Sequence, residues 1–173
     1  YSYYSYCATR SSEISGNNIH DFPFSGATTS STNFSSIYGN YVYYAYGNNT
    51  YKFKMDGNTF KNIFYSTGSR YLNYIYYPQY IYITNNVIDN VDGTSTSSTA
   101  YDWYIYYPTA YRCNGNTCTN SETQGYLYNF YIYYASSGAY TWNEFNDNVI
   151  TNNTSVNYVY AAYIYYYTGT NNI

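Results

Sequence analysis

The feature that most constrains the fold is a tyrosine-rich word that recurs about every thirty residues. The word Tyr-x-Tyr-Tyr begins at Tyr1, Tyr41, Tyr74, Tyr104, Tyr131 and Tyr163. Successive steps are 40, 33, 30, 27 and 32 residues, and four of the six words read Tyr-Ile-Tyr-Tyr. A period of this length is the signature of proteins built from stacked repeats. Because one short unit cannot bury its apolar side chains alone, the sequence predicts a solenoid.

A second word, Asn-x-Ile/Phe, follows the first within the same unit. It begins at Asn17, Asn58, Asn86, Asn148 and Asn171. The offset between the two words is 17 residues both from Tyr41 to Asn58 and from Tyr131 to Asn148. Asn tolerates the left-handed backbone of a sharp corner, and its amide can bond the equivalent Asn one turn above and below. We therefore expect these five residues to form an asparagine ladder, with the Ile or Phe pointing into the core.

The repeating unit is predicted to consist of β-strands. Segments such as Tyr-Ile-Tyr and Asn-Val-Ile-Asp-Asn-Val alternate with period two and are rich in β-branched and aromatic residues. Stretches rich in Gly, Ser and Asn separate them and have the composition of loops. The prediction is an all-β, single-stranded parallel solenoid of about six turns with roughly 30 residues per turn. Residues 1–173 would form one domain, as a segment or repeating subunit of a longer assembly.

The composition is unusual and supports a folded chain. Tyr accounts for 34 of 173 residues, and charged residues make up only 9%, against roughly 25% in ordinary globular proteins. The mean hydropathy of -0.55 does not indicate disorder, since disordered chains have few aromatic and many charged residues. The six basic residues are scattered, so nucleic acid is not an expected partner. No apolar run is long enough to span a membrane.

The two words together resemble those of a known group of proteins. Asn-x-Ile/Phe-x-Asn words that follow Tyr-Ile-Tyr strands resemble the pectate-lyase-like right-handed parallel β-helix proteins. In style they are closest to the Asn/Thr/Tyr-rich adhesin-like surface proteins of microbes. The resemblance covers nearly the whole chain, but it concerns repeat style and not a unique signature. It implies a right-handed coil of parallel sheets that is exported to the cell surface or beyond.

The chain lacks the residues that enzymes of this fold would need. Such enzymes use clustered carboxylates, bound calcium, or Arg or Lys as a base. Here the closest acidic groupings are Asp89 with Asp92 and Glu144 with Asp147, and each spans a turn where carboxylates are usually solvated. His20 is the only histidine, so a Ser/His/Asp relay or a zinc site of several His ligands lacks parts. We expect no catalytic, cofactor or metal site, and no enzymatic activity.

The tyrosine words are dense enough to form a recognition surface. Alternate residues of a strand point to the same side, so stacked turns would present an exposed aromatic ladder. The expected members are Tyr74, Tyr76, Tyr104, Tyr106, Tyr131, Tyr133, Tyr163 and Tyr165. Such a ladder suits sugar stacking or contact with a protein. The alternative is that half of these tyrosines fill the interior and the rest only cover it.

Two cysteines bracket a turn sequence. Cys113 and Cys118 flank Asn-Gly-Asn-Thr, which favours a disulfide within a loop that projects from the coil. An inserted loop would also explain why 62 residues separate Asn86 from Asn148. Two free thiols are the alternative, and Cys7 would be either free or bonded to another chain. Asn-x-Ser/Thr words, which are candidate glycosylation sites, begin at Asn33, Asn48, Asn152 and Asn153.

The expected function is that of a structural surface or filament protein. The chain begins within a tyrosine word and ends within the word at Asn171, without the polar cap that a terminal turn needs. Head-to-tail self-association through stacked solenoid ends would therefore give a filament. The alternative is a carbohydrate-binding adhesin that uses the tyrosine ladder, with glycans as partners. An active lyase would need a site that the sequence does not contain.

Overall fold

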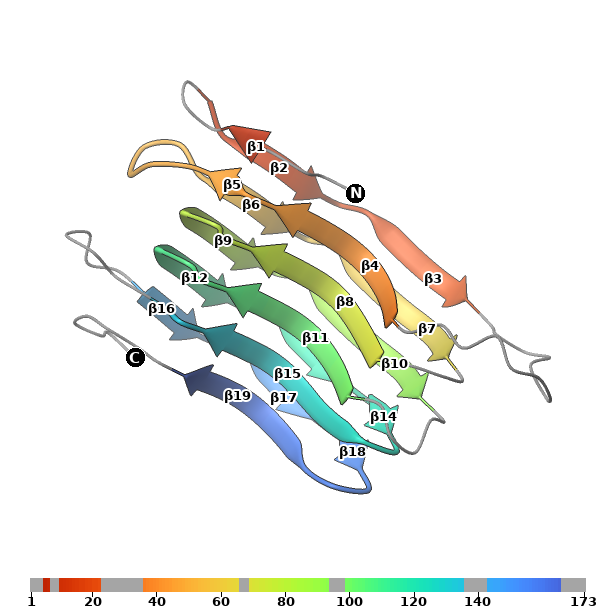
Figure 1. The fold of residues 1–173 in the computed structure, drawn as a ribbon. Helices are drawn as coiled ribbons and strands as arrows, with labels where there is room; N and C mark the ends of the chain where they lie inside the picture. The colour runs from red at the N-terminus through yellow and green to blue at the C-terminus, as the bar shows by residue number, and fades with distance from the viewer. Residues whose placement is uncertain are drawn as a thin grey trace.

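The chain folds into a coil of short parallel strands (Figure 1). The computed structural model describes residues 5–6, 10–22, 36–65, 69–93, 99–135 and 143–165. Within these ranges every regular element is a β-strand, and every pairing between strands is parallel. The strands stack as a β-solenoid of about four turns with a spacing of about 30 residues. The prediction of a parallel β-solenoid is confirmed.

Three sheets form the walls of the coil. Sheet I contains β4 (Ser36–Tyr43), β8 (Ser69–Tyr76), β11 (Thr99–Tyr106), β15 (Tyr126–Tyr133) and β19 (Val159–Tyr165). Sheet II contains β2 (Ser12–Ser15), β6 (Phe53–Asp56), β9 (Tyr80–Thr84), β12 (Ala110–Asn114) and β16 (Asn143–Asn146). Sheet III contains β3 (Asn18–Phe22), β7 (Thr59–Tyr65), β10 (Val87–Gly93), β13 (Thr117–Thr119), β14 (Glu122–Thr123), β17 (Val149–Thr151) and β18 (Thr154–Ser155). A separate pair consists of β1 (Ser5–Tyr6) and β5 (Ala45–Tyr46).

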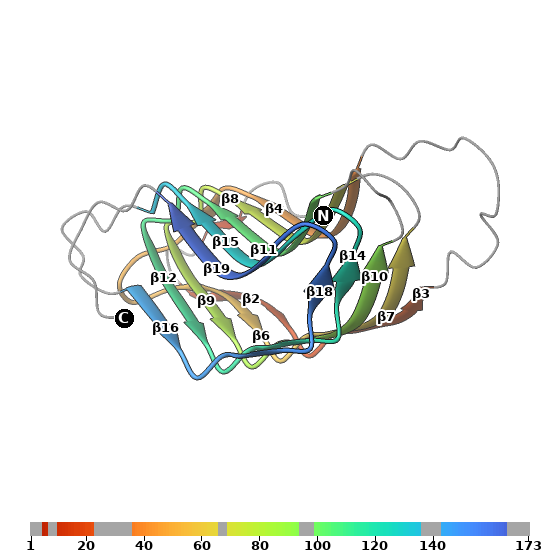
Figure 2. The ribbon, with the colours of Figure 1, turned by 90° about the horizontal axis from the view of Figure 1, so that it is seen from below.

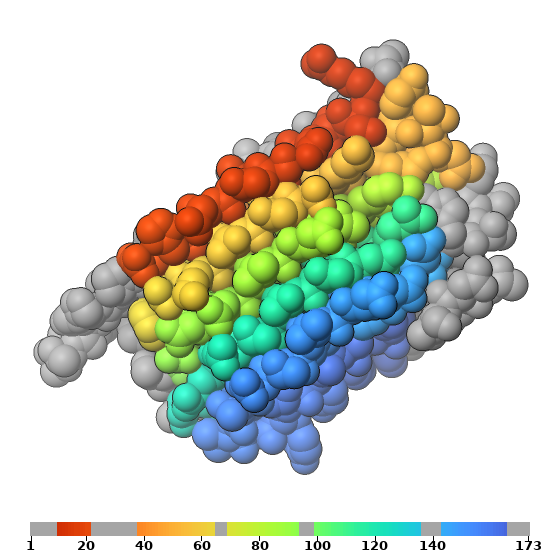
Figure 3. All heavy atoms as spheres, turned by 180° about the vertical axis from the view of Figure 1, so that it is seen from behind, coloured from red at the N-terminus to blue at the C-terminus, as the bar shows by residue number. Residues whose placement is uncertain are grey.

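Each turn of the chain passes through sheets II, III and I in that order. Seen along the stacking direction in Figure 2, the three sheets enclose one interior. The space-filling view in Figure 3 shows successive turns as parallel bands. Residues one turn apart are therefore direct neighbours, as Tyr104 is of Tyr74 and Tyr131.

The expected count of six turns was too high. Sheets I and II each contain five strands, which bound about four turns. The prediction counted tyrosine words, but each word marks a strand, and a turn is the interval between two of them. The first word, at Tyr1, lies outside the described residues.

The core consists of aliphatic and aromatic side chains stacked in columns. Ile75, Ile105 and Ile132 follow one another on sheet I, and all three are fully buried. Similar columns line the other two sheets through Met55, Ile83, Phe60 and Ile88. Each such side chain contributes roughly 1.5–3 kcal/mol on leaving water.

Left-handed residues occupy the same three places in successive turns. One group precedes the asparagine ladder, with φ between 55° and 66°: Gly16, Gly57, Asn85, Gly115 and Asp147. A second group lies within sheet III, with φ between 52° and 55°: Asp21, Asn62, Asn90, Asn120 and Asn152. A third group ends sheet I, with φ between 53° and 57°: Tyr44, Tyr77, Tyr107 and Tyr134. Bulky residues rarely adopt this conformation, so the tyrosines in the third group need compensating contacts.

The two cysteines are free thiols in the core, so the predicted disulfide is wrong. Cys113 on β12 and Cys118 on β13 are both fully buried. Cys113 lies beside Ile83 of the preceding turn, and Cys118 lies between Ile88 and Ile150. Each thiol therefore fills an aliphatic position of a core column. Burial raises the pKa of both thiols.

The segment between the cysteines is a regular corner and not a projecting loop. Gly115 takes the left-handed conformation that other turns have at the same place. Asn116 follows it and is fully buried. The expected insertion is thus absent: Asn116-Thr117-Cys118 is the asparagine word of this turn, with Cys in place of Ile or Phe.

Candidate functional site: the tyrosine face of sheet I

The outward side of sheet I is covered by four columns of tyrosine, which we call the tyrosine face. Column 1 contains Tyr38, Tyr71, Tyr101, Tyr128 and Tyr160. Column 2 contains Tyr41, Tyr74, Tyr104, Tyr131 and Tyr163. Column 3 contains Tyr43, Tyr76, Tyr106, Tyr133 and Tyr165. Column 4 contains Tyr44, Tyr77, Tyr107 and Tyr134.

The structure places the eight expected ladder tyrosines in columns 2 and 3. Strict alternation did not predict columns 1 and 4. Column 4 consists of the left-handed tyrosines that follow the strands of sheet I, and column 1 is displaced by a break in the alternation within the strands. On β8, Leu72 and Asn73 are consecutive and both buried, so Tyr71 and Tyr74 face outward although they are three residues apart. The spacing Tyr-x-x-Tyr, which recurs in all five strands of sheet I, is the signal that could have found column 1.

Within each column the rings stack face to face along the coil. In column 2 the centroid of the Tyr104 ring lies 5.0 Å from Tyr74 and 5.1 Å from Tyr131, with planes 5° and 8° apart. Column 4 follows the same rule, because the Tyr77 and Tyr107 centroids are 4.8 Å apart. Stacking of this kind stabilises aromatic pairs by about 0.5–1.5 kcal/mol beyond burial. The tyrosine face therefore presents mainly ring edges and hydroxyls to the outside.

Columns 1 and 2 meet edge to face. Tyr71 makes this contact with Tyr74 of its own turn, at 5.4 Å and 80°, and with Tyr104 of the next turn, at 5.5 Å and 84°. Columns 3 and 4 meet in the same way, as Tyr76 and Tyr77 do at 4.5 Å and 84°. Each ring is thus held from two directions.

The tyrosine face carries no charged side chain among the described residues. The charged residues of sheet I, Arg70 and Asp102, both point inward and are fully buried. Arg70 Nη2 donates to Asp102 Oδ1 at 2.6 Å, and Asn129 Nδ2 donates to Asp102 Oδ2 at 2.7 Å. Burial and, secondarily, neighbouring tyrosines raise the pKa of Tyr131 to about 12. The tyrosine face is accordingly neutral over the ordinary pH range.

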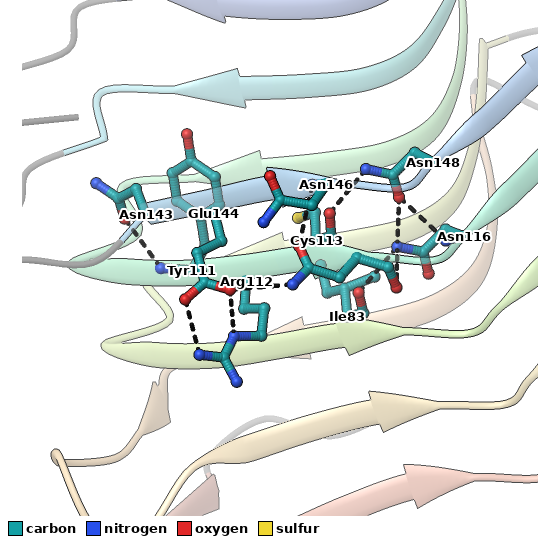
Figure 4. Close-up of polar contacts among 10 residues, drawn as sticks. Ile83, Tyr111, Arg112, Cys113, Asn116, Asn143, Glu144, Asn146 and Asn148 are labelled. Carbon is teal, nitrogen blue, oxygen red and sulfur yellow. Dashed lines mark hydrogen bonds and ion pairs between the residues drawn. The ribbon is translucent and has the colours of Figure 1, made fainter. Parts of the chain in front are cut away.

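The asparagine ladder holds the corner between sheets II and III. Its described members are Asn17, Asn58, Asn86, Asn116 and Asn148. Asn86 Nδ2 donates to Asn116 Oδ1 at 2.9 Å and to the Met55 carbonyl at 2.8 Å. Its Oδ1 accepts from the backbone N–H and the Nδ2 of Asn58, at 3.0 and 2.9 Å. Figure 4 shows the next step, between Asn116 and Asn148. Asn171 lies outside the described residues.

One member of each acidic grouping seen in the sequence, Asp89 and Glu144, is engaged in an ion pair. Glu144 accepts from Arg112 at 2.7 Å (Figure 4), and this contact, ahead of its other contacts, lowers the pKa of Glu144. Asp89 lies 3.0 Å from Lys61. His20 lies at the surface with its Nδ1 2.9 Å from the carboxylate of its neighbour. The described residues contain no group of three or more His, Cys, Asp or Glu side chains that could hold a metal ion.

The glycosylation candidates lie in different surroundings. Asn152 is exposed at a left-handed corner. Asn48 Oδ1 accepts two backbone N–H groups at 2.8 Å, and Asn153 Oδ1 accepts the Ser121 N–H at 2.9 Å. Asn33 lies outside the described residues.

The last described turn leaves the coil open at one end, which Figure 2 views from outside. We call this surface the open edge; it is formed by β16, β17, β18 and β19, and no described strand pairs with their outer side. Val159 is 40% exposed, although Leu127, its neighbour on β15, is fully buried. Ala162 is exposed in the same way beside the buried Phe130. Core positions are therefore uncovered at this end.

No helix in the described part of the chain is long and apolar enough to cross a membrane. Comparison with protein-family models, with curated proteins and with solved structures found no match for this chain.

Proposed function

We propose that this chain is a structural protein of a surface layer or filament, assembled by end-to-end stacking of its solenoid turns and without catalytic activity. The observation that carries the proposal is the open edge. Within the described residues, the three sheets and columns 1 to 3 of the tyrosine face end there, and the core positions Val159 and Ala162 are exposed. An identical or similar turn would continue all of them at once.

The backbone supplies the first reason for stacking. Among the described strands, β16 and β19 are the last of their sheets, and the edge of a sheet is a template for pairing with another strand. Core burial supplies the second reason, because a further turn would cover Val159 and Ala162. These gains act at the same surface and reinforce one another.

The tyrosine columns supply the third reason. Tyr160 and Tyr163 stack on Tyr128 and Tyr131 of β15, and a further turn would extend both columns. Few charges oppose the contact, since charged residues are 9% of the chain. A head-to-tail contact that does not close into a ring propagates as a filament.

An extracellular location is part of the proposal. It is supported by the likeness in repeat style to pectate-lyase-like and adhesin-like surface proteins, and by the low charge of the chain. Asn152, which is exposed at its corner, is the acceptor that we propose for a glycan.

The second candidate is a carbohydrate-binding adhesin that uses the tyrosine face. Its support is the set of partly exposed tyrosines on this face. Tyr38, for example, is 43% exposed. We rank it second because sugars stack on ring faces, and the tyrosine face has those surfaces covered by neighbouring turns. Titration with polysaccharides tests it directly.

The test of the structural role is the assembly state of purified protein, imaged by electron microscopy and measured by sedimentation. We expect filaments, and we expect Ala162→Lys to abolish them, because it places a charge on the open edge. Thr117→Lys is the matched control: it adds the same charge pointing outward on β13, which is paired with a strand on each side and lies away from the open edge. A wild-type protein that stays a 20.1 kDa monomer, or an Ala162→Lys variant that assembles as well as the control, would overturn the proposal.

A further inference from the structure

We propose that the tyrosine face is a site of oxidative phenol coupling, in which a one-electron oxidant links a column 1 tyrosine to a column 2 tyrosine of the next turn. The inference concerns single molecules, so it does not depend on the filament proposed above. It assigns a covalent modification to the described surface that is richest in exposed phenols.

The contact between the two columns recurs in the same geometry along the coil. Its members are the pairs Tyr38–Tyr74, Tyr71–Tyr104, Tyr101–Tyr131 and Tyr128–Tyr163. Their ring centroids are 5.3 to 5.7 Å apart and their planes are inclined by 77° to 87°. Every pair joins two successive strands of sheet I, so each coupling would connect two turns.

Edge-to-face rings suit the reaction better than stacked rings. The new bond joins ring carbons beside the hydroxyl, and these carbons lie on the ring edge. In a stacked pair such as Tyr74–Tyr104, the two faces oppose each other and the backbones are held about 4.8 Å apart by the sheet. In Tyr71–Tyr104 the edge of one ring already points at the other, and the two residues are offset along the strand.

The chemistry balances with hydrogen peroxide as the oxidant and a peroxidase as its activator. Each phenol gives one electron to the oxidant and one proton to water, which produces two phenoxyl radicals. The radicals couple through one new carbon–carbon bond beside each oxygen. The two ring hydrogens at that bond then move to the oxygens through water and restore both phenols. In total one peroxide becomes two waters, and the protein loses two hydrogens.

Competing oxidisable side chains are shielded within the described residues. Met55, Trp103, Cys113 and Cys118 are each 0% exposed, so a diffusible oxidant does not reach them in the folded protein. The tyrosines of the tyrosine face lie at the surface, and each has several aromatic neighbours. A radical formed there has a coupling partner in reach.

The experiment treats dilute protein with peroxidase and peroxide and follows dityrosine fluorescence, monomer mass and cross-linked peptides. We expect a loss of two hydrogens per link within monomers, and peptides that join residue 71 to 104 or 101 to 131. Tyr104→Phe keeps the ring but removes the phenol, so it should abolish the link to Tyr71. Tyr82→Phe, on the outward side of sheet II, is the matched control and should leave the links unchanged.

The result is separable from the assembly experiment. The Ala162→Lys variant should show the same links within single molecules. Links that form only between molecules, that join tyrosines distant in the structure, or that have the same distribution in urea-unfolded protein would overturn the inference. Absence of dityrosine under these conditions would overturn it as well.

Discussion

At the residue scale, asparagine performs two different tasks in each turn. The ladder residues, such as Asn86, are buried and use both ends of the amide to join turns. Corner residues, such as Asn90, tolerate the left-handed backbone and remain closer to solvent. The abundance of Asn in the sequence hides this division, because both kinds stand in similar words. The left-handed φ of the corner residues and the buried amide of ladder residues such as Asn86 separate them.

The ladder leads to a prediction for Asn86→Ala. The substitution leaves the backbone N–H and amide of Asn58 and the carbonyl of Met55 without their partner. Since each unsatisfied buried group costs about 1–3 kcal/mol, we expect a loss of roughly 3 kcal/mol or more in the free energy of unfolding. Urea denaturation measures it. Asn146→Ala, at an exposed amide, is the control, and equal effects of the two substitutions would contradict the role of the ladder.

The core cysteines lead to a second residue-scale prediction. In a Cys7→Ser background, the thiols of Cys113 and Cys118 should both be present and should resist thiol reagents in native protein. Their burial and raised pKa both suppress the reactive thiolate. Both should react at once on unfolding in denaturant. A native protein that is two hydrogens lighter by mass spectrometry would instead show a disulfide.

At the scale of elements, a buried ion pair ties four strands together. Arg70 on β8 donates to Asp102 on β11 and to the Val91 carbonyl on β10, and Asn129 on β15 donates to the same carboxylate. Two charges removed from water are stable only when both are paired. The network therefore fixes which strands lie next to one another.

The ion pair leads to a prediction for Asp102→Leu. We expect this single variant to lose about 3–5 kcal/mol of stability, because it leaves the Arg70 charge buried without its carboxylate. The double variant with Arg70→Leu should be more stable than the single one. Arg112→Ala, which breaks a partly exposed pair with Glu144, is the control and should cost about 1 kcal/mol or less. A double variant less stable than Asp102→Leu would contradict this account.

The strands and the repeat could be predicted from the sequence, but part of the register could not. Period-two words predicted the parallel solenoid because alternation is a local property of the chain. Column 1 of the tyrosine face was missed because two consecutive inward residues, such as Leu72 and Asn73, shift the alternation. Asn116 was missed because its word contains Cys118 in place of Ile or Phe. The Arg70–Asp102 pair joins residues 32 positions apart, and only the register brings them together.

At the scale of the whole molecule, the neutral and the charged outward surfaces of the coil lie on different sheets. The tyrosine face is neutral, whereas the outward sides of sheets II and III carry charged side chains that are exposed or partly exposed. These are Glu13, Lys54, Asp56, Arg112 and Glu144 on sheet II, and His20, Asp21, Lys61, Asp89, Asp92 and Glu122 on sheet III. Stability in such a coil is approximately a sum over turns and their interfaces. A stabilising contact that recurs in every turn of one wall therefore contributes to stability once for each turn.

The tyrosine face makes the whole molecule sensitive to alkali. Unfolded tyrosine ionises near pH ~10, whereas burial, and then neighbouring tyrosines, raise the pKa of Tyr131 to about 12. Burial also raises the pKa of Tyr71, Tyr101 and Tyr104. Between these pH values the folded protein keeps protons that the unfolded chain has lost. The contribution of these tyrosines to the free energy of unfolding is therefore fully present below the pKa of tyrosine in the unfolded chain. It is lost as the pH rises through their pKa in the folded protein.

We expect alkaline unfolding to be cooperative and to coincide with phenol ionisation. The free energy of unfolding should be constant just below pH ~10 and should decline above it, because folding raises the pKa of many tyrosines and each acts in the same direction. Phenolate absorbance and circular dichroism, recorded on the same samples, measure ionisation and folding together. Protein held unfolded in urea is the control, and its phenols should titrate near the ordinary value. Phenolate absorbance that reaches its full value near pH ~10 while the β-signal persists would show that stacking in the tyrosine face does not restrain ionisation.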